Sequence, residues 1–394
     1  MNLFMRRLQH DWASWLAVSF IALLPFGRLA EIPLSAFTIA LLVLARTAEN
    51  RTLIRSSARF VLPLFLCYWV PMFLSSFDSM DMQKSWVQTF AALRYLAAAL
   101  ALSLLLRAPS DRERVLRWTA WLLLFWAADG FIQLFFGRDL FGIAMHPDRL
   151  NALFVKKYQF FGPTLAMLSP LVLEHARRNW PSWAWAMAFT LILGAVMIAG
   201  MRAGWLTMAI VLGTYMVLML KRENRELRRT VLTIPVLVVI VIAGSYLASP
   251  LFQERLDVTQ AFTTGTEASK DASSMERIPI FTNALRMYRS HPVNGVGVRA
   301  FPVAYMKYAD ADDVHIRKSG GASGATHAHN VLLEVMSDTG TIGLAGLVLA
   351  VVFLFLYRRR TTPSERWEAF PYALAVLLIL FPLNSHFAIY GTYT

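Results

Sequence analysis

The feature that most constrains this chain is a succession of long apolar stretches that follow one another along nearly its whole length. A helix needs about 20 predominantly apolar residues to cross a bilayer. A soluble domain would interrupt such stretches with polar faces every few residues, whereas here only 16% of all residues are charged and 57% are hydrophobic. The sequence therefore predicts an all-α polytopic membrane protein with about 11–12 transmembrane helices.

Eleven of these stretches are predicted to span the membrane. They cover residues 12–29, 32–48, 60–77, 86–106, 115–136, 160–175, 182–200, 203–220, 230–249, 329–357 and 368–390. Three regions are expected, namely transmembrane helices in 1–249, one long loop with short helices in 250–328, and C-terminal transmembrane helices in 329–394. An odd number of spans leaves open whether a twelfth helix is missing after Thr394.

The distribution of basic residues predicts the orientation in the membrane. The net charge of +13 is concentrated in short loops between apolar stretches, which is typical of cytoplasmic loops and argues against nucleic-acid binding. With a cytoplasmic N-terminus, every inside loop is basic, and the clusters are Arg6/Arg7, Arg46/Arg51/Arg55/Arg59, Arg107/Arg112/Arg114/Arg117, Arg177/Arg178, Lys221/Arg222/Arg225/Arg228/Arg229 and Arg358/Arg359/Arg360/Arg366. The sequence thus predicts a bacterial inner-membrane protein whose loop 250–328 faces the periplasm.

The long loop is expected to carry function, because long loops usually do. Within it, 265–274 is interpreted as a lid, 279–290 as an amphipathic helix and 291–295 as the end of that helix. Its nine basic residues are Arg255, Lys270, Arg277, Arg286, Arg289, Arg299, Lys307, Arg317 and Lys318. As a set they suit an anionic ligand such as a lipid diphosphate, because Arg binds phosphate bidentately; the alternative is a solvated basic surface.

Two arginines outside the loop are also candidates. Arg202 lies in a tight turn between two spans on the predicted outer side, where arginine is disfavoured, so it is interpreted as a ligand-binding residue or as an interfacial arginine that reaches for headgroups. Arg94 lies inside a span, where a charge indicates function unless it is paired. Asp129, at a similar depth in the next span, is its expected partner in a structural ion pair.

Two histidines, His327 and His329, stand where the loop re-enters the membrane. A histidine at the outer end of a helix can accept a proton from a sugar hydroxyl near neutral pH, although a capping role is the common alternative. A zinc site with His315 is the weaker interpretation, because residues two apart do not share a helical face and no HExxH motif occurs. For the same reason His327 is expected to point away from His329. The single cysteine, Cys67, offers neither a disulfide nor a thiolate cluster.

Three motifs together resemble the O-antigen ligase and Wzy-type polymerase superfamily. They are 201–204 (Met-Arg-Ala-Gly), the run from Arg277 through 291–297 (His-Pro-Val-Asn-Gly-Val-Gly), and 329–334 (His-Asn-Val-Leu-Leu-Glu) continuing to 340–343 (Gly-Thr-Ile-Gly). Their order and spacing agree with the family over about a third of the chain. Gly340, Gly343 and Gly346 also follow one another at every third residue, which predicts close helix packing.

The resemblance implies a GT-C-like glycosyltransferase that transfers O-antigen from undecaprenyl diphosphate to lipid A-core oligosaccharide, inverting, with neither metal nor other cofactor. His329, Arg202 and Arg277 match the family's essential histidine and arginines, and are expected to be catalytic. The further candidates for binding the diphosphate or glycan are Arg299, Arg94, Lys84, Arg286, Arg289 and His327.

Alternatives of two kinds remain open. The nearer is a polymerase or a protein O-oligosaccharyltransferase of the same superfamily, which differs only in its acceptor. The other is a lipid-linked glycan transporter, which favours paired repeats and mid-membrane acidic residues, and no internal repeat is found in the sequence. Neither the sugar specificity nor the oligomeric state follows from these motifs.

Overall fold

The computed structural model describes residues 3–146, 149–154, 160–220, 225–250, 252–254, 256–257, 277–381 and 388–390, and every element in them is a helix. The first half of the chain forms α1 (Leu3–Ala22), a 3₁₀ helix η1 (Leu24–Ala30), α2 (Glu31–Leu44), α3 (Ala48–Ser75), α4 (Met82–Ala91), α5 (Leu93–Leu105) and α6 (Pro109–Phe136). The second half forms α7 (Phe161–Asn179), α8 (Ser182–Ile198), α9 (Arg202–Leu220), α10 (Arg225–Ala248), α13 (Ile278–Ser290), α14 (Phe301–Tyr308), α15 (Val314–Lys318), α16 (Val331–Arg360) and α17 (Pro363–Ile379). The predicted lid at 265–274, Arg255 and Lys270 lie outside the described residues.

The all-α polytopic membrane class is confirmed. Among the described residues, five helices are long and apolar enough to cross a bilayer, and they are Leu24–Leu44, Ala48–Ser75, Met82–Leu105, Pro109–Phe136 and Val331–Arg360. Three shorter apolar helices follow the predicted spans in α8, α9 and α10. Large apolar side chains face outward from these helices, and Ile39 on α2 and Val239 on α10 are 63% and 66% exposed. An outer surface of this kind is suited to lipid rather than water.

Two predicted spans in the first half of the chain are interrupted. Span 12–29 is not one helix, because α1 ends at Ala22 and the chain then bends at Gly27, which has a positive φ of 62°. Span 86–106 is divided at Ala92 into α4 and α5. Glycine tolerates the left-handed backbone at the first break because it has no Cβ.

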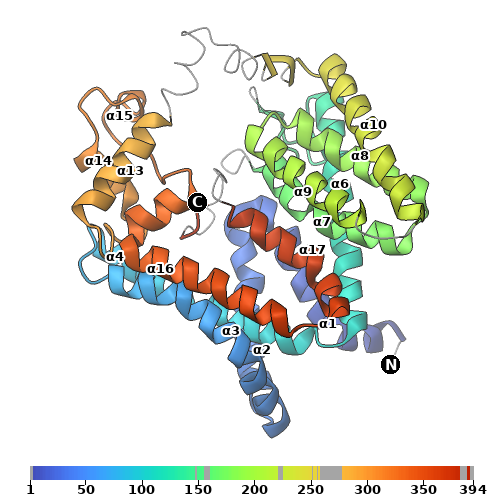
Figure 1. The fold of residues 1–394 in the computed structure, drawn as a ribbon, viewed down its shortest axis with the longest axis horizontal. Coiled ribbons are helices and arrows are strands. Elements are labelled where there is room, and N and C mark those ends of the chain that lie inside the picture. The colour runs from blue at the N-terminus through green and yellow to red at the C-terminus, as the bar shows by residue number, and fades with distance from the viewer. Residues whose placement is uncertain are drawn as a thin grey trace.

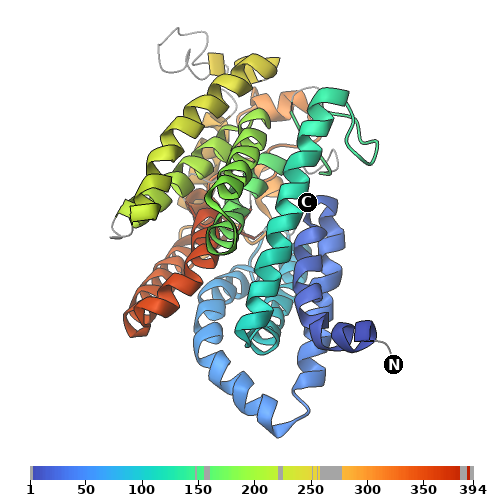
Figure 2. The same cartoon turned by 90° about the vertical axis from the view of Figure 1, so that its right-hand side faces the viewer.

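The helices form two groups (Figure 1). In one group α16 lies along α3, with α13, α14 and α15 gathered at one end of the pair. In the other, α7 packs against α6, α8 and α9 around a large apolar core that includes Trp126, Phe161 and Phe189. Figure 2 shows the long α6 standing beside the dark-blue α1, and α17 packs on α7, so the two groups are joined through these contacts.

Basic residues collect at one end of the helices, which we call the basic end. It consists of the starts of α3, α6 and α17 and the ends of α7 and α16. Helices α3 and α16 run antiparallel, because Phe60 of α3 contacts Tyr357 near the end of α16, with ring centroids 4.3 Å apart, and Cys67, further along α3, lies against Gly346, nearer the start of α16. Arg112 of α6 pairs with Glu368 of α17 at 2.7 Å, and Arg177 of α7 lies over the Trp367 ring at 5.2 Å. These contacts bring together four of the six basic clusters of the predicted inside loops.

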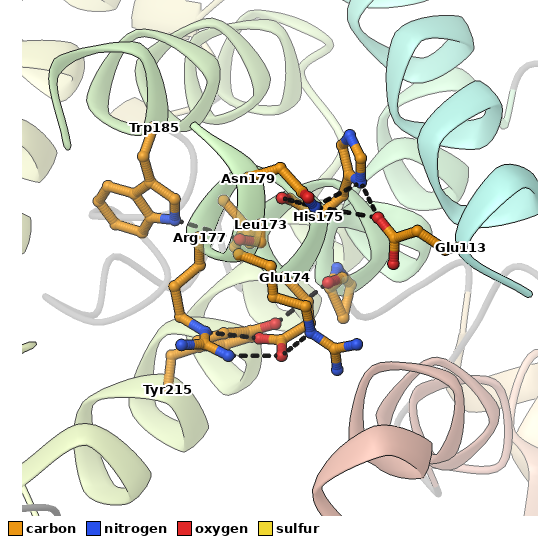
Figure 3. Close-up of polar contacts among 10 residues, drawn as sticks. Glu113, Leu173, Glu174, His175, Arg177, Asn179, Trp185 and Tyr215 are labelled. Atoms are coloured by element: carbon orange, nitrogen blue, oxygen red, sulfur yellow. Dashed lines mark hydrogen bonds and ion pairs between the residues drawn. The ribbon is translucent and has the colours of Figure 1, made fainter. Parts of the chain in front are cut away.

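A buried polar cluster stabilises the basic end (Figure 3). Glu174 is fully buried and accepts hydrogen bonds from Arg177 at 2.7 and 2.8 Å and from Arg178 at 2.7 Å. The adjacent His175 contacts Glu113 of α6 through Nδ1 at 3.0 Å. A buried carboxylate is tolerated when it is paired in this way, so the cluster fixes the end of α7 against α6.

Candidate active site

The site is built where the loop segment 291–297 enters a break in α16. Gly340 has a φ of 62° and a non-helical backbone, so the helix is interrupted there. A broken helix leaves peptide groups that need new partners. Val296 N–H donates to the carbonyl of Ser337 at 2.8 Å, and Gly297 N–H donates to the carbonyl of Asp338 at 3.1 Å. The loop thereby replaces bonds that a continuous helix would make.

The same segment also accepts hydrogen bonds from the helix. Thr341 N–H donates to the carbonyl of Pro292 at 2.8 Å, and Ile342 N–H donates to the carbonyl of Val293 at 3.1 Å. A methyl group on Gly340 would lie 2.5 Å from the Val293 carbonyl carbon, so a side chain cannot be accommodated there. Hydrogen bonds therefore run from the loop to the helix on one side of Gly340 and from the helix to the loop on the other side.

The glycines of α16 have different roles. The prediction of close helix packing is confirmed for Gly346, where a methyl group would overlap the Cys67 carbonyl oxygen of α3. A methyl group on Gly343 would instead meet Thr339, within α16 itself. From the loop side, a side chain on Gly295 would overlap the backbone of Asp338. Only the first of these contacts is the helix-to-helix approach that the spacing predicts.

The connection between α3 and α4 supports the loop from a third side. Met80 N–H donates to the Val296 carbonyl at 2.9 Å, and the Ser85 hydroxyl donates to the Val298 carbonyl at 2.5 Å. Asn294 donates through Nδ2 to Asp78 Oδ1 at 2.5 Å. Loop segment 291–298 is thus held by two helical elements far apart in sequence, which is the rigid support that a catalytic site requires.

The two histidines lie together just ahead of α16. Their ring centroids are 3.8 Å apart with an interplanar angle of 46°, which corrects the expectation that His327 points away from His329. That expectation assumed helical geometry, but α16 begins only at Val331, and His329 has a left-handed φ of 51°. Two residues apart on a helix would diverge, whereas this turn brings the rings onto each other. Ala328 between them is fully buried.

His327 is held in an uncharged state. Burial, followed by the nearby His329 and the Arg299 guanidinium, lowers the pKa of His327 to about 3. Its Nδ1 contacts the Thr326 hydroxyl at 3.1 Å, while its Nε2 is buried and has no hydrogen-bond partner among the described residues. A buried imidazole nitrogen without a partner is costly and is therefore a group that a bound molecule could satisfy.

Arg299 lies beside two buried carboxyl groups of α16, Glu334 and Asp338, each 3% exposed. Its own N–H donates to the Asp338 carboxyl group, and its backbone has a left-handed φ of 66°. Glu334 also accepts a hydrogen bond from Tyr390 N–H at 3.3 Å. The backbone of Arg299 therefore has a structural role, while the contact of its guanidinium with a diphosphate stays a prediction.

Sequence reasoning missed these two carboxyl groups. The signal was present, because Glu334 and Asp338 are four residues apart in an apolar stretch and therefore share one helical face. Acidic residues within a span indicate a functional or paired site. Their partner could not be predicted, because Arg299 precedes Glu334 by 35 residues and reaches it only through the folded loop.

The predicted ion pair between Arg94 and Asp129 is wrong. Arg94 pairs instead with Glu31 at the start of α2, at 3.1 Å. Asp129 accepts a hydrogen bond from Leu140 N–H at 2.9 Å. Depth along neighbouring spans does not decide which faces meet, and the packing of α5 against α2 does.

Three further basic candidates are placed as follows. Arg286 contacts Asp310 at 3.0 Å and the Tyr308 carbonyl at 2.9 Å, so it ties α13 to the turn after α14. Lys84 pairs with Asp81 at 2.7 Å, and its side chain is 61% exposed. Arg289 is exposed in the last turn of α13, where a cation is favoured by the helix dipole. The structure directs the first two toward neighbouring protein groups.

The remaining arginines lie at the end of the molecule that carries the histidines. Arg202 is half-buried and begins α9 after a tight turn at Gly200, whose φ is 69°. A side chain on Gly204 would lie 3.3 Å from the Gly162 backbone at the start of α7, the end of α7 away from the basic end. Arg277 is exposed and precedes the first turn of α13, which confirms the predicted helix at 279–290. Arg202 and His329 belong to different helix groups but to the same end.

Within the described ranges, no three His, Cys, Asp or Glu side chains come together in a way that could hold a metal ion. His315 packs edge-on against the Tyr305 ring at 6.1 Å. The groups that the site presents are two histidines with arginines and hydrogen-bonding groups at the same end of the molecule, a set that suits acid–base chemistry.

A comparison with known families finds a match in the second half of the chain. Residues 187–348 match the family model described as O-antigen ligase. The matched segment begins in α8 and ends in α16, so it contains Arg202, Arg277, Arg299 and both histidines. No curated protein sequence matches the chain.

Proposed function

We propose that this chain, whose residues 187–348 match the family model described as O-antigen ligase, transfers O-antigen polysaccharide from undecaprenyl diphosphate to lipid A-core oligosaccharide. The reaction takes place at the periplasmic face of the bacterial inner membrane. Membrane lipids surround the helices and hold both lipid-borne substrates at one depth. The enzyme is a glycosyltransferase, and its loop region 250–328 stands between two sets of transmembrane helices.

One observation supports the proposal above the others: a histidine pair stands at the start of a long apolar helix, at the end opposite the basic end. Lipid-linked sugars present their diphosphate at the membrane surface, at the level where such a helix begins. Arg202 and Arg277 lie at starts of helices, and Arg277 is exposed. These positions suit a base and two diphosphate ligands around one membrane-surface substrate.

The proposed mechanism is a single displacement. The acceptor hydroxyl attacks the anomeric carbon of the donor, a new glycosidic C–O bond forms, and the bond from that carbon to the diphosphate oxygen breaks. His329 takes the hydroxyl proton, and Arg202 and Arg277 stabilise the charge on the departing undecaprenyl diphosphate. Attack from the face opposite the leaving group inverts the anomeric configuration. The reaction consumes no nucleotide and needs no metal ion to generate the nucleophile, because the diphosphate is already a good leaving group.

The decisive experiment supplies purified protein in lipid nanodiscs with undecaprenyl-diphosphate glycan and one of two acceptors. The first is lipid A-core oligosaccharide, and the second is another molecule of the donor. Mass spectrometry of the products is expected to show glycan joined to lipid A-core. Extension of the donor alone would identify a polymerase, and the absence of any covalent product with movement of donor across the bilayer would identify a transporter.

Replacing Arg202 or Arg277 by Ala is expected to lower transfer more than replacing it by Lys, because Lys keeps the charge but not the bidentate geometry. A lost charge-assisted contact of about 1.5–3 kcal/mol corresponds to about a ten- to a hundredfold lower rate if it acts in the transition state. Initial rates in nanodiscs measure the effect. Arg360→Ala, an exposed arginine at the opposite, basic end of the helices, is the control. Wild-type rates in both Ala variants would show that neither arginine contributes to the site.

The orientation can be checked by cysteine labelling in a variant whose Cys67 is replaced by Ser. A membrane-impermeant thiol reagent added to intact spheroplasts is expected to label Ser290→Cys, at the end of α13, and not Ser364→Cys, at the basic end. Both positions are exposed, so reactivity reports the side of the membrane. The reverse labelling pattern would move the site to the cytoplasm and contradict the periplasmic reaction.

A further inference from the structure

We propose that His327 is a positioning residue for His329, an uncharged ring that fixes the base in its working orientation and limits the pair to a single proton. The inference rests on the proposed function, in which His329 is the base. It concerns a residue that, on sequence spacing alone, should have pointed elsewhere. The experiments below separate the failure of this inference from the failure of the proposed function.

The geometry of the histidine pair is the first argument that His327 orients His329. The two rings are tilted by 46° to each other with their centroids 3.8 Å apart, and this contact depends on the left-handed backbone of His329, with its φ of 51°. A non-glycine residue in that conformation is strained and persists only where its surroundings fix it. Ala328 is fully buried, and Asn330 caps α16 by accepting Leu333 N–H at 3.1 Å, so the backbone is fixed on both sides of His329. The ring of His327 then restricts the rotation of the His329 side chain.

The charged groups around His327 are the second argument, because they keep its ring uncharged. The charged or titratable groups that act on His327 are His329 and Arg299, and both disfavour its protonation. Arg299 in turn faces Glu334 and Asp338 on α16. Burial adds to the effect and brings the pKa of His327 to about 3. Any proton that the pair takes up at neutral pH therefore belongs to His329, because two charged rings in contact would repel each other strongly.

These two steps explain why the pair suits general-base catalysis. A base acts efficiently when it is held within hydrogen-bond reach of the proton it removes, and a displacement of about 1 Å can lower a rate about a hundredfold. An uncharged neighbouring ring positions the base without competing for the proton. When His329 becomes protonated, it faces an aromatic ring instead of a second cation, and such a contact is favourable.

The activity test compares three variants in nanodiscs. His327→Ala is expected to lower kcat about ten- to a hundredfold, while the KM for the lipid-linked donor changes less than about threefold, because orientation and not binding is lost. His327→Phe, which keeps an uncharged ring but has no nitrogen, is expected to restore most of kcat. His315→Ala, another histidine of the loop, is the control and keeps wild-type kinetics.

Three results would overturn the inference. They are wild-type kcat in His327→Ala, a loss confined to KM, or a His327→Phe variant as slow as His327→Ala. The last two would make the buried Nε2 a direct ligand of the substrate. A wild-type protein that forms no glycosidic product in any assay would instead contradict the proposed function.

A second measurement does not depend on activity. In protein with ¹³C-labelled histidine rings, one NMR signal is expected to keep the chemical shift of neutral imidazole down to pH 5, and to disappear in both His327 variants. The reason is the lowered pKa of about 3, which leaves the ring uncharged throughout that range. Titration of the His327 signal near the ordinary pKa of about 6.5 would contradict the inference, whether or not the protein transfers glycan.

Discussion

Replacing His329 by Ala is expected to lower the rate of glycan transfer about a hundredfold to ten-thousandfold, the usual range for losing an acid–base group. The variant should still fold and bind the donor, because α16 is capped by Asn330 and held by segment 291–297 independently of the His329 side chain. The measurement is the single-turnover rate with saturating undecaprenyl-diphosphate glycan and lipid A-core, together with donor affinity.

The control for this prediction is the melting temperature of the variant in detergent, which should match that of the wild type. Transfer should also survive a strong chelator. Full activity in His329→Ala would show that His329 is not the general base. Inhibition by the chelator, with recovery when zinc is added, would indicate a metal site instead. Loss of donor binding together with the rate would instead indicate that His329 holds the substrate.

The second large effect is expected from Gly340→Ala, which should destabilise the fold by about 2–6 kcal/mol. About 1–3 kcal/mol arises from forcing a side chain into the left-handed region, and about 1–3 kcal/mol more from overpacking against the loop. The new methyl group would lie 2.5 Å from the Val293 carbonyl carbon. Hydrogen bonds between the loop and α16 flank this glycine on both sides. The substitution should therefore separate segment 291–297 from α16 and abolish transfer. The measurements are the detergent melting temperature and the transfer rate.

Gly213→Ala provides a matched control for this prediction. Gly213 lies within α9, and nothing in the described structure would be within 4 Å of an added methyl group apart from its own helix. The same chemical change should therefore alter stability by less than about 1 kcal/mol and leave transfer unchanged. Equal melting temperatures for Gly340→Ala and the wild type would show that the loop does not depend on the break in α16.

Several features follow from the sequence because they depend on local pattern. The apolar stretches determine a membrane protein, since each needs about 20 residues that can exist in lipid. The amphipathic pattern determines the loop helix, predicted at 279–290 and found as α13 from Ile278 to Ser290. Four of the six predicted basic clusters, at the starts of α3, α6 and α17 and the ends of α7 and α16, gather at one end of the helices, with Arg202 and His329 at the other. The resemblance to a family also follows, because its motifs depend on order and spacing, and residues 187–348 match the family model described as O-antigen ligase.

What only the tertiary structure decided is which side chains meet. Hydropathy gives the depth of a residue in the membrane but not the direction in which its side chain faces. The sequence therefore suggests Asp129 as the partner of Arg94, whereas Arg94 pairs with Glu31 in the structure. Helical spacing separates residues two apart, yet a left-handed turn brings the rings of His327 and His329 together. The break at Gly340 and its exchange of hydrogen bonds with 291–297 join residues that are 41 to 49 positions apart in the sequence. Contacts of this kind depend on how the helices and loops pack against one another, and the local sequence pattern around each residue does not determine that packing.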